Sequence, residues 1–141
     1  MMQLAVVSVP VSDPECALAF YRDVLGFIVQ RDEPMGPTAR WIQLKPPSGP
    51  AGITLVTWFD SMPPGSAQGL VLETSDIERA HDKLEANGLA ITSIQDASWG
   101  RFATFFDPDG NGWVLSTVYP AAEAHAITGS AASPGAGKSP V

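Results

Sequence analysis

The chain of 141 residues has one cysteine, Cys16, so an intrachain disulfide cannot form. Proteins without disulfides are typical of a reducing compartment, and we expect a cytoplasmic location. Basic residues are also few, because eight lysines and arginines stand against 15 acidic residues and give a net charge of −7. Since binding to phosphates needs a basic face, we expect no nucleic-acid partner.

Long apolar runs and histidines are scarce as well. The apolar run at residues 4–9 is too short to cross a bilayer and has no basic flank. We therefore expect neither a signal peptide nor a membrane partner. The two histidines are His81, in a predicted helix, and His125, near the C-terminus. The chain therefore offers few imidazole side chains as metal ligands.

The sequence does contain an internal repeat. The motif SDPECA at residues 12–17 returns as SDIERA at residues 75–80. An apolar, strand-like run precedes each copy, and an amphipathic helix that ends near a glycine follows it. The serine of each copy is predicted to cap its helix, with a glutamate three residues later completing a capping box. The repeat indicates two similar modules that share one sheet.

Each predicted helix is followed by three predicted strands, so the order β-α-β-β-β occurs twice. These strands are expected at residues 27–31, 40–44, 53–58, 89–95, 101–106 and 112–118. We expect a single α+β domain over residues 1–119, with module one at about 1–60 and module two at about 67–119. Residues 120–141 are rich in Ala, Gly, Ser and Pro, which predicts a flexible tail.

Two motifs resemble those of a known family. The sequence FYRDVLGF at residues 20–27 and FDPDGN at residues 106–111 are similar to signatures of the vicinal oxygen chelate superfamily. That superfamily includes glyoxalase I, bleomycin-resistance proteins and extradiol dioxygenases. The resemblance implies a curved eight-stranded mixed sheet around a cavity, with helices on the outer face, in a homodimer.

The resemblance also implies where a metal would bind. Enzymes of the superfamily hold a divalent ion with His, Glu or Gln on four strands. Residue by residue, these positions fall on Val6, Thr54, Gly69 and Val114. Valine and glycine side chains offer no donor atom, so we expect no metal and no cofactor at this place.

Strand parity extends the set of cavity-facing residues. The candidate ligand-binding residues are Val6, Trp41, Gln43, Thr54, Trp58, Gly69, Glu73, Trp99, Arg101 and Val114. The tryptophans can stack on a flat ligand, or they can be core or interface residues. Glu73 is a candidate general base, or a solvated residue at a strand end. Arg40 and Gln43 have opposite parity, so they cannot both face inward.

These observations lead to one hypothesis with two alternatives. The leading hypothesis is metal-free binding of a small apolar or aromatic molecule, resembling the drug-sequestering, bleomycin-resistance branch of the superfamily. The first alternative is a glyoxalase- or dioxygenase-like enzyme, a lyase, isomerase or oxygenase, which acts without metal through Glu73 or holds metal at other positions. The second is a partner-binding module that keeps only the scaffold. Cys16 is expected to be buried, and His81 partly exposed.

Overall fold

The structure is a computed structural model, and it describes residues 1–120. Most of the predicted tail, with His125, lies outside the described residues. The chain forms two compact units. The first unit comprises Met1–Ala67 and Asp107–Asn111, and the second comprises Gln68–Phe106 and the chain from Gly112 onward.

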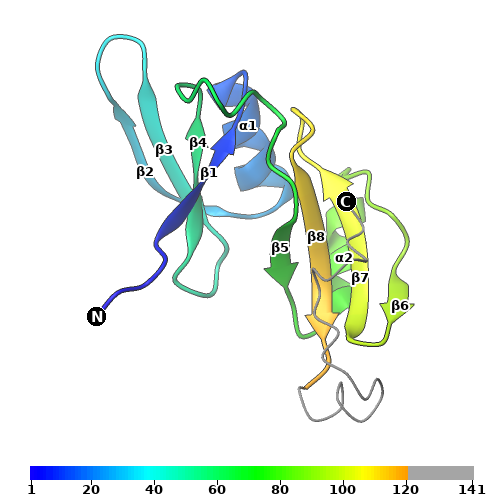
Figure 1. Cartoon of the computed structure of the whole chain (residues 1–141). Coiled ribbons are helices and arrows are strands. Elements are labelled where there is room, and N and C mark those ends of the chain that lie inside the picture. Colours follow the sequence, from blue (N-terminus) through cyan, green and yellow to red (C-terminus); the bar gives the residue numbers. More distant parts are fainter. Residues whose placement is uncertain (121–141) are drawn as a thin grey trace. The chain divides into compact units, whose positions relative to one another are not determined.

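The first unit contains one four-stranded sheet and one helical segment (Figure 1). Its elements are β1 (Val6–Pro10), α1 (Pro14–Ala19), the π-helical turn η1 (Phe20–Val24), β2 (Ile28–Pro34), β3 (Arg40–Lys45) and β4 (Gly52–Val56). The strand order is β1-β4-β3-β2, with β1 parallel to β4 and the other pairs antiparallel.

The second unit repeats this topology. Its elements are β5 (Leu70–Glu73), α2 (Ile77–Ala86), β6 (Gln95–Ala97), β7 (Gly100–Phe106) and β8 (Gly112–Val118). The strand order is β5-β8-β7-β6, with β5 parallel to β8. The predicted α+β class and the two β-α-β-β-β modules are therefore confirmed.

The residue that caps each helix differs from the prediction. The N-caps are Asp13 and Asp76, one residue after the predicted serines. The carboxylate of Asp13 accepts hydrogen bonds from the backbone N–H groups of Glu15 and Cys16, and that of Asp76 accepts one from Arg79. Aspartate and serine are comparable caps, so the sequence alone does not choose between neighbours.

One face of each sheet is packed by its own helix. In the first unit, Ala17 and Tyr21 are buried from the helical side, and Val9, Ile42 and Leu55 from the sheet. In the second unit, α2 packs on β7 and β8. Its buried residues are Ile77, His81 and Leu84. The buried residues of the two helices are thus largely those that the apolar periodicity predicts.

Three local expectations were wrong. His81 is buried, and its Nε2 donates a hydrogen bond to the carbonyl oxygen of Thr92 at 2.7 Å. Cys16, by contrast, is exposed. In place of a strand at 89–95, only Ile91 bridges to β7, and β6 follows later. The reason is that the Thr92 side chain accepts the backbone N–H of Thr104, so a side chain takes over a bond of the strand ladder.

The two modules carry matching ion triads on their helix-covered faces. Arg40 in β3 pairs with Asp32 of β2 at 2.7 Å and with Glu15 of α1. Its counterpart Arg101 in β7 pairs with two acidic residues at 2.8 and 2.9 Å, Asp96 of β6 and Glu78 of α2. In each triad the hydrogen bonds with the two carboxylates raise the pKa of the arginine. Each arginine thereby ties a helix to the edge of its sheet.

No helical segment within residues 1–120 combines the length and the apolar character needed to cross a bilayer.

Candidate functional site

The candidate site of the first unit is the sheet face opposite α1, which we call the Trp41 face. Arg40 points to α1, where it pairs with Glu15, so alternation turns Trp41 and Gln43 to the other side. Thr54 is the register partner of both Gln43 and Ser8 and shares their face. Val6 lies on this face as well, two residues before Ser8.

Two tryptophans form the aromatic part of the Trp41 face. The rings of Trp41 and Trp58 stack with centroids 6.4 Å apart and an interplanar angle of 26°. Both side chains are only half-buried. Trp58 follows β4, which ends at Val56, so its ring meets Trp41 from a connecting segment instead of from a strand. The pair presents an aromatic surface of the kind that stacks on flat molecules.

Polar groups run along the edge of this aromatic pair. The indole N–H of Trp41 donates to Gln43 Oε1 at 3.1 Å, and Gln43 Nε2 donates to Gln30 Oε1 at 3.1 Å. Next in the row is the Thr54 hydroxyl, which is 2% exposed. Its Oγ1 has no hydrogen-bond partner in the part of the chain that the structure describes.

The second unit has an equivalent face opposite α2, which we call the Glu73 face. Val71 and Glu73 of β5 pair in register with Val114 and Ser116 of β8, so all four share this face. Gly69 precedes β5 and has a φ of +78°. Val71 and Glu73 are exposed, whereas Val114 and Ser116 are buried. A shallow depression of about 420 Å³ is lined by Glu73, Thr74, Ser75, Thr117 and Val118.

One predicted site residue lies elsewhere, and another reaches the Glu73 face only through a neighbour. Arg101 belongs to the helix-covered face of the second sheet, where it pairs with Glu78 and Asp96, so it is on the opposite side from Val114. Trp99 lies in the β6–β7 turn, is 6% exposed, and stacks with centroids 5.5 Å apart on Phe102, the register partner of Ser116 on the Glu73 face. Strand parity could not place Trp99, because a turn residue has no defined face.

The four positions at which the resemblance implies a metal do not fit one. The side chains of Val6, Gly69 and Val114 carry no donor atom, and Thr54 offers one neutral hydroxyl. A divalent ion needs several nitrogen, oxygen or sulfur donors that converge on one point. No step of a reaction is therefore derived through a metal at these residues.

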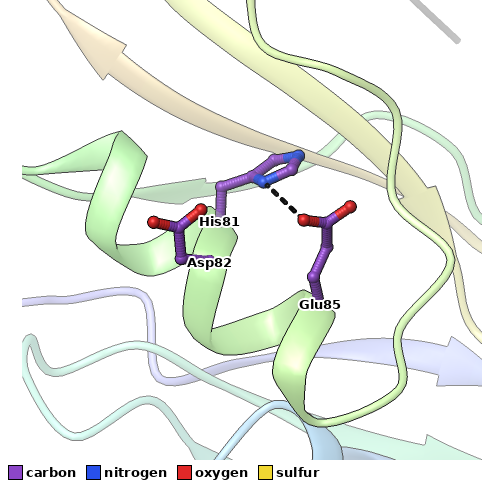
Figure 2. Close-up of side chains that lie close together, drawn as sticks. All are labelled: His81, Asp82 and Glu85. Atoms are coloured by element: carbon purple, nitrogen blue, oxygen red, sulfur yellow. Dashed lines mark ion pairs between the residues drawn. The ribbon is translucent and has the colours of Figure 1, made fainter.

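A separate cluster of ligand-type side chains lies on α2. His81 Nδ1 is 3.7 Å from Glu85 Oε1, and the ring and the carboxylate face each other across one helical turn (Figure 2). Asp82 brings a third potential ligand atom within 4.8 Å of the other two. His81 and Asp82 are sequence neighbours, however, and adjacent helical residues do not point the same way. The cluster is therefore a poor chelate, and we assign no ion to it.

Gln30 is a residue of the Trp41 face that the sequence did not indicate. Gln30 was not predicted, although its carbonyl oxygen completes the polar row beside Gln43. A register irregularity between Val29 and Arg31 makes the facing of Gln30 unreadable from simple alternation. Ser8, by contrast, has the parity of Val6, and strand alternation predicts it on this face.

The fold and the pattern of the two faces define a protein of paired β-α-β-β-β modules. The family model described as the Glyoxalase/Bleomycin resistance protein/Dioxygenase superfamily matches residues 3–115. The chain belongs to this superfamily.

Several relatives are similar over nearly their whole length. TnmS3, an antibiotic binding protein from Streptomyces sp. CB03234, is 39% identical, with a TM-score of 0.79 over 84% of this chain and 98% of TnmS3. A glyoxalase/bleomycin resistance protein from the same strain is 42% identical, with a TM-score of 0.73 over 81% of this chain and 99% of its own. YetH of Bacillus subtilis (strain 168) is 34% identical over 117 residues, covering 80% of this chain and 96% of YetH.

Proposed function

We propose that this protein binds a small, flat, largely apolar or aromatic molecule without metal and without chemical conversion. The binding surface is the Trp41 face, where the ligand stacks on Trp41 and Trp58. The candidate residues Gly69, Glu73 and Val114 form the Glu73 face of the second unit, which we propose as a separate contact surface for a small molecule.

The observation that carries the proposal is the Trp41–Trp58 pair. Its rings are stacked and half-buried, and the indole N–H of Trp41 is already held by Gln43 at 3.1 Å. A tryptophan fixed by a neighbour loses little further conformational freedom when a ligand binds, so more of the stacking energy remains as affinity. Ligand pockets commonly combine such apolar walls with a few placed polar groups.

Two further observations support binding over metal chemistry. The donor-poor residues Val6, Gly69 and Val114 stand where a chelating relative would need ligands. In addition, TnmS3, at 39% identity, is described as an antibiotic binding protein. Fold alone does not fix function in such a superfamily, so the proposal depends on the residues of the site.

Titration of the full chain with neutral flat aromatic compounds tests the proposal, with intrinsic tryptophan fluorescence as the readout. We expect saturable quenching by some members of the panel, and treatment with a metal chelator should leave this quenching unchanged. Each compound should be recovered chemically unaltered after the titration. If no compound changes the emission, or if binding requires a stoichiometric divalent ion, the proposal is wrong.

A metal-free enzyme is the second candidate, and the surroundings of Glu73 favour it. Glu73 is the register partner of Ser116, whose hydroxyl is enclosed, and it lines the depression of about 420 Å³. Glu73→Gln separates the two functions. Under the binding proposal, the variant retains affinity and neither protein converts the compound. Turnover by the wild type that is lost in Glu73→Gln would instead establish the enzyme.

We further propose that the protein is a cytoplasmic homodimer. Three exposed apolar side chains on the second unit, Val71, Phe106 and Val118, offer surface for self-association. The expected result from light scattering during size-exclusion chromatography is twice the chain mass of 14.9 kDa. A mass of one chain at micromolar concentration would contradict the dimer.

A further inference from the structure

Thr54 carries a hydroxyl that is enclosed but unused by the described residues. The residue is 2% exposed, and its Oγ1 has no hydrogen-bond partner among residues 1–120. Buried hydroxyls are nearly always paired, because desolvating one without a partner costs free energy. Valine has almost the same shape without this cost. A threonine at the centre of β4 therefore calls for a partner outside the described part of the chain.

The neighbours of Thr54 indicate which side of the hydroxyl such a partner would use. Gln43, directly opposite in register, has its carbonyl oxygen engaged by Trp41 and one amide hydrogen engaged by Gln30. Its second amide hydrogen is a donor, as is the hydroxyl of Thr54. Two donors in adjacent register positions are suited to one acceptor that takes two hydrogen bonds, which is the property of a carbonyl oxygen.

We infer that Thr54 is the polar anchor of the Trp41 face and selects flat aromatic ligands that carry a carbonyl group on their edge. The rings stack on Trp41 and Trp58, and the carbonyl oxygen accepts hydrogen bonds from Thr54 Oγ1 and Gln43 Nε2. This inference rests on the proposed function and adds to it the chemical class of the ligand. Gln43 is half-buried and is held by two hydrogen bonds of 3.1 Å, so its free amide hydrogen has a defined position beside Thr54.

The second unit provides a matched control. Ser116 Oγ is equally enclosed, at 0% exposure, and likewise has no partner among the described residues. Ser116 belongs to the Glu73 face and not to the tryptophan pair. Ser116→Ala therefore removes a hydroxyl of the same kind from a place where the inference assigns no carbonyl contact.

The test compares 9-fluorenone with fluorene, two rigid tricyclic molecules that differ by one carbonyl oxygen. Affinities are measured by calorimetry on the full chain for the wild type, Thr54→Val, Thr54→Ser and Ser116→Ala. We expect the wild type to prefer 9-fluorenone by roughly fivefold to tenfold, the effect of one to two hydrogen bonds. Thr54→Val should lower this preference by at least about threefold, because only the Gln43 donor remains, while its fluorene affinity stays within about twofold. Thr54→Ser and Ser116→Ala should keep the wild-type preference.

Thermal unfolding of the same variants shows whether the hydroxyl serves the ligand or the fold. If Thr54 is held for the ligand, Thr54→Val without ligand melts at or above the wild-type temperature, because an unpaired polar group is removed. A clear fall in melting temperature, with the preference for 9-fluorenone unchanged, assigns the hydroxyl to the fold and overturns the inference.

The remaining outcomes separate this inference from the proposed function. Equal binding of both compounds by the wild type, or loss of the preference in Ser116→Ala instead of Thr54→Val, overturns the role of Thr54 and leaves the binding function standing. Failure of both compounds to bind contradicts the binding function and the anchor together.

Discussion

Tyr21 and Asp107 are 86 residues apart in the sequence, yet the phenol hydroxyl of Tyr21 donates to Asp107 Oδ2 at 2.7 Å in a buried hydrogen bond. The side chain of Asn111 donates to the same oxygen at 2.7 Å and to the carbonyl oxygen of Pro10 at 2.8 Å. Residues 107–111, which connect β7 to β8 along the chain, are therefore fastened into the first unit by buried polar contacts.

Replacement of Tyr21 by phenylalanine should lower the stability of the fold. The variant keeps the packing of the ring on Phe27, where the centroids are 5.7 Å apart, but removes one donor to the Asp107 carboxylate. Hydrogen bonds to charged groups contribute about 1.5–3 kcal/mol, so we expect the free energy of unfolding to fall by that amount. Urea denaturation followed by circular dichroism measures it.

Tyr119→Phe is the matched control for this substitution. Tyr119 is half-buried just after β8, and the same hydroxyl deletion there should change the free energy of unfolding by less than about 0.5 kcal/mol. Equal losses in the two variants would show that the Tyr21–Asp107 bond has no special weight.

Gly65 also bears on the turn at 107–111, and a pair of glycines isolates its effect. Gly65 and Gly36 have φ values of +82° and +81°, so alanine at either pays about 1–2 kcal/mol for the left-handed backbone. At Gly65 a Cβ would additionally collide with the carbonyl oxygen of Asp109, whereas at Gly36 it meets open space. Gly65→Ala should therefore destabilise the protein by at least about 1 kcal/mol more than Gly36→Ala. Equal denaturation midpoints would contradict the close approach.

Much of the fold could be predicted from local patterns. The two SD motifs, the apolar periodicity of the helices and the turn at 107–112 are short-range signals, and they were sufficient for the order β-α-β-β-β in both modules. The prediction that Ser12 caps the first helix was wrong, because the hydroxyl of Ser12 has a partner that is distant in the sequence. It donates to Asp109 at 2.6 Å, which leaves Asp13 to cap the helix. Contacts of that range leave no trace in a single sequence.

The candidate site was predictable in part for the same reason. Alternation was enough to place Val6 and Thr54 on one face, but it left open which of Arg40 and Gln43 shares that face. It did not give the stacking of Trp58 on Trp41, because Trp58 lies beyond the end of β4. Nor did it show that Arg101 faces α2, which depends on the register of β7 against β8.

The ion triad around Arg40 gives stability with a defined pH dependence. The hydrogen bond with Arg40 lowers the pKa of Asp32 below its ordinary value of 3.8. The pair therefore stabilises the fold above pH 3.8, and this contribution is lost as the pH falls through the lowered pKa. Asp32→Asn should be less stable than the wild type by a few tenths of a kcal/mol at pH 6, because the pair is partly solvent-exposed. The difference should shrink as the pH falls below 3.8 through the lowered pKa, because the wild-type carboxylate then becomes protonated.

Urea denaturation of both proteins at several pH values measures this difference. A gap that stays constant down to pH 2 would mean that Asp32 acts through its shape and not through its charge. The matched substitution in the other module is Asp96→Asn. It tests whether the loss of one carboxylate partner of Arg101 has an effect of similar size.

The last prediction concerns the contribution of the Trp41–Trp58 pair to ligand affinity. In Trp58→Leu the ring that stacks on Trp41 is lost while an apolar side chain remains. Aromatic pairs are worth about 0.5–1.5 kcal/mol beyond their buried area, so the affinity for a flat aromatic compound should fall by roughly threefold to tenfold. Phe106→Leu, an exposed aromatic residue of the second unit, should leave the affinity within about twofold. Calorimetric titration with 9-fluorenone compares the three proteins. A fall of the same size in both variants would mean that ligand affinity does not depend specifically on the Trp41 face, because any exposed ring would then serve equally well.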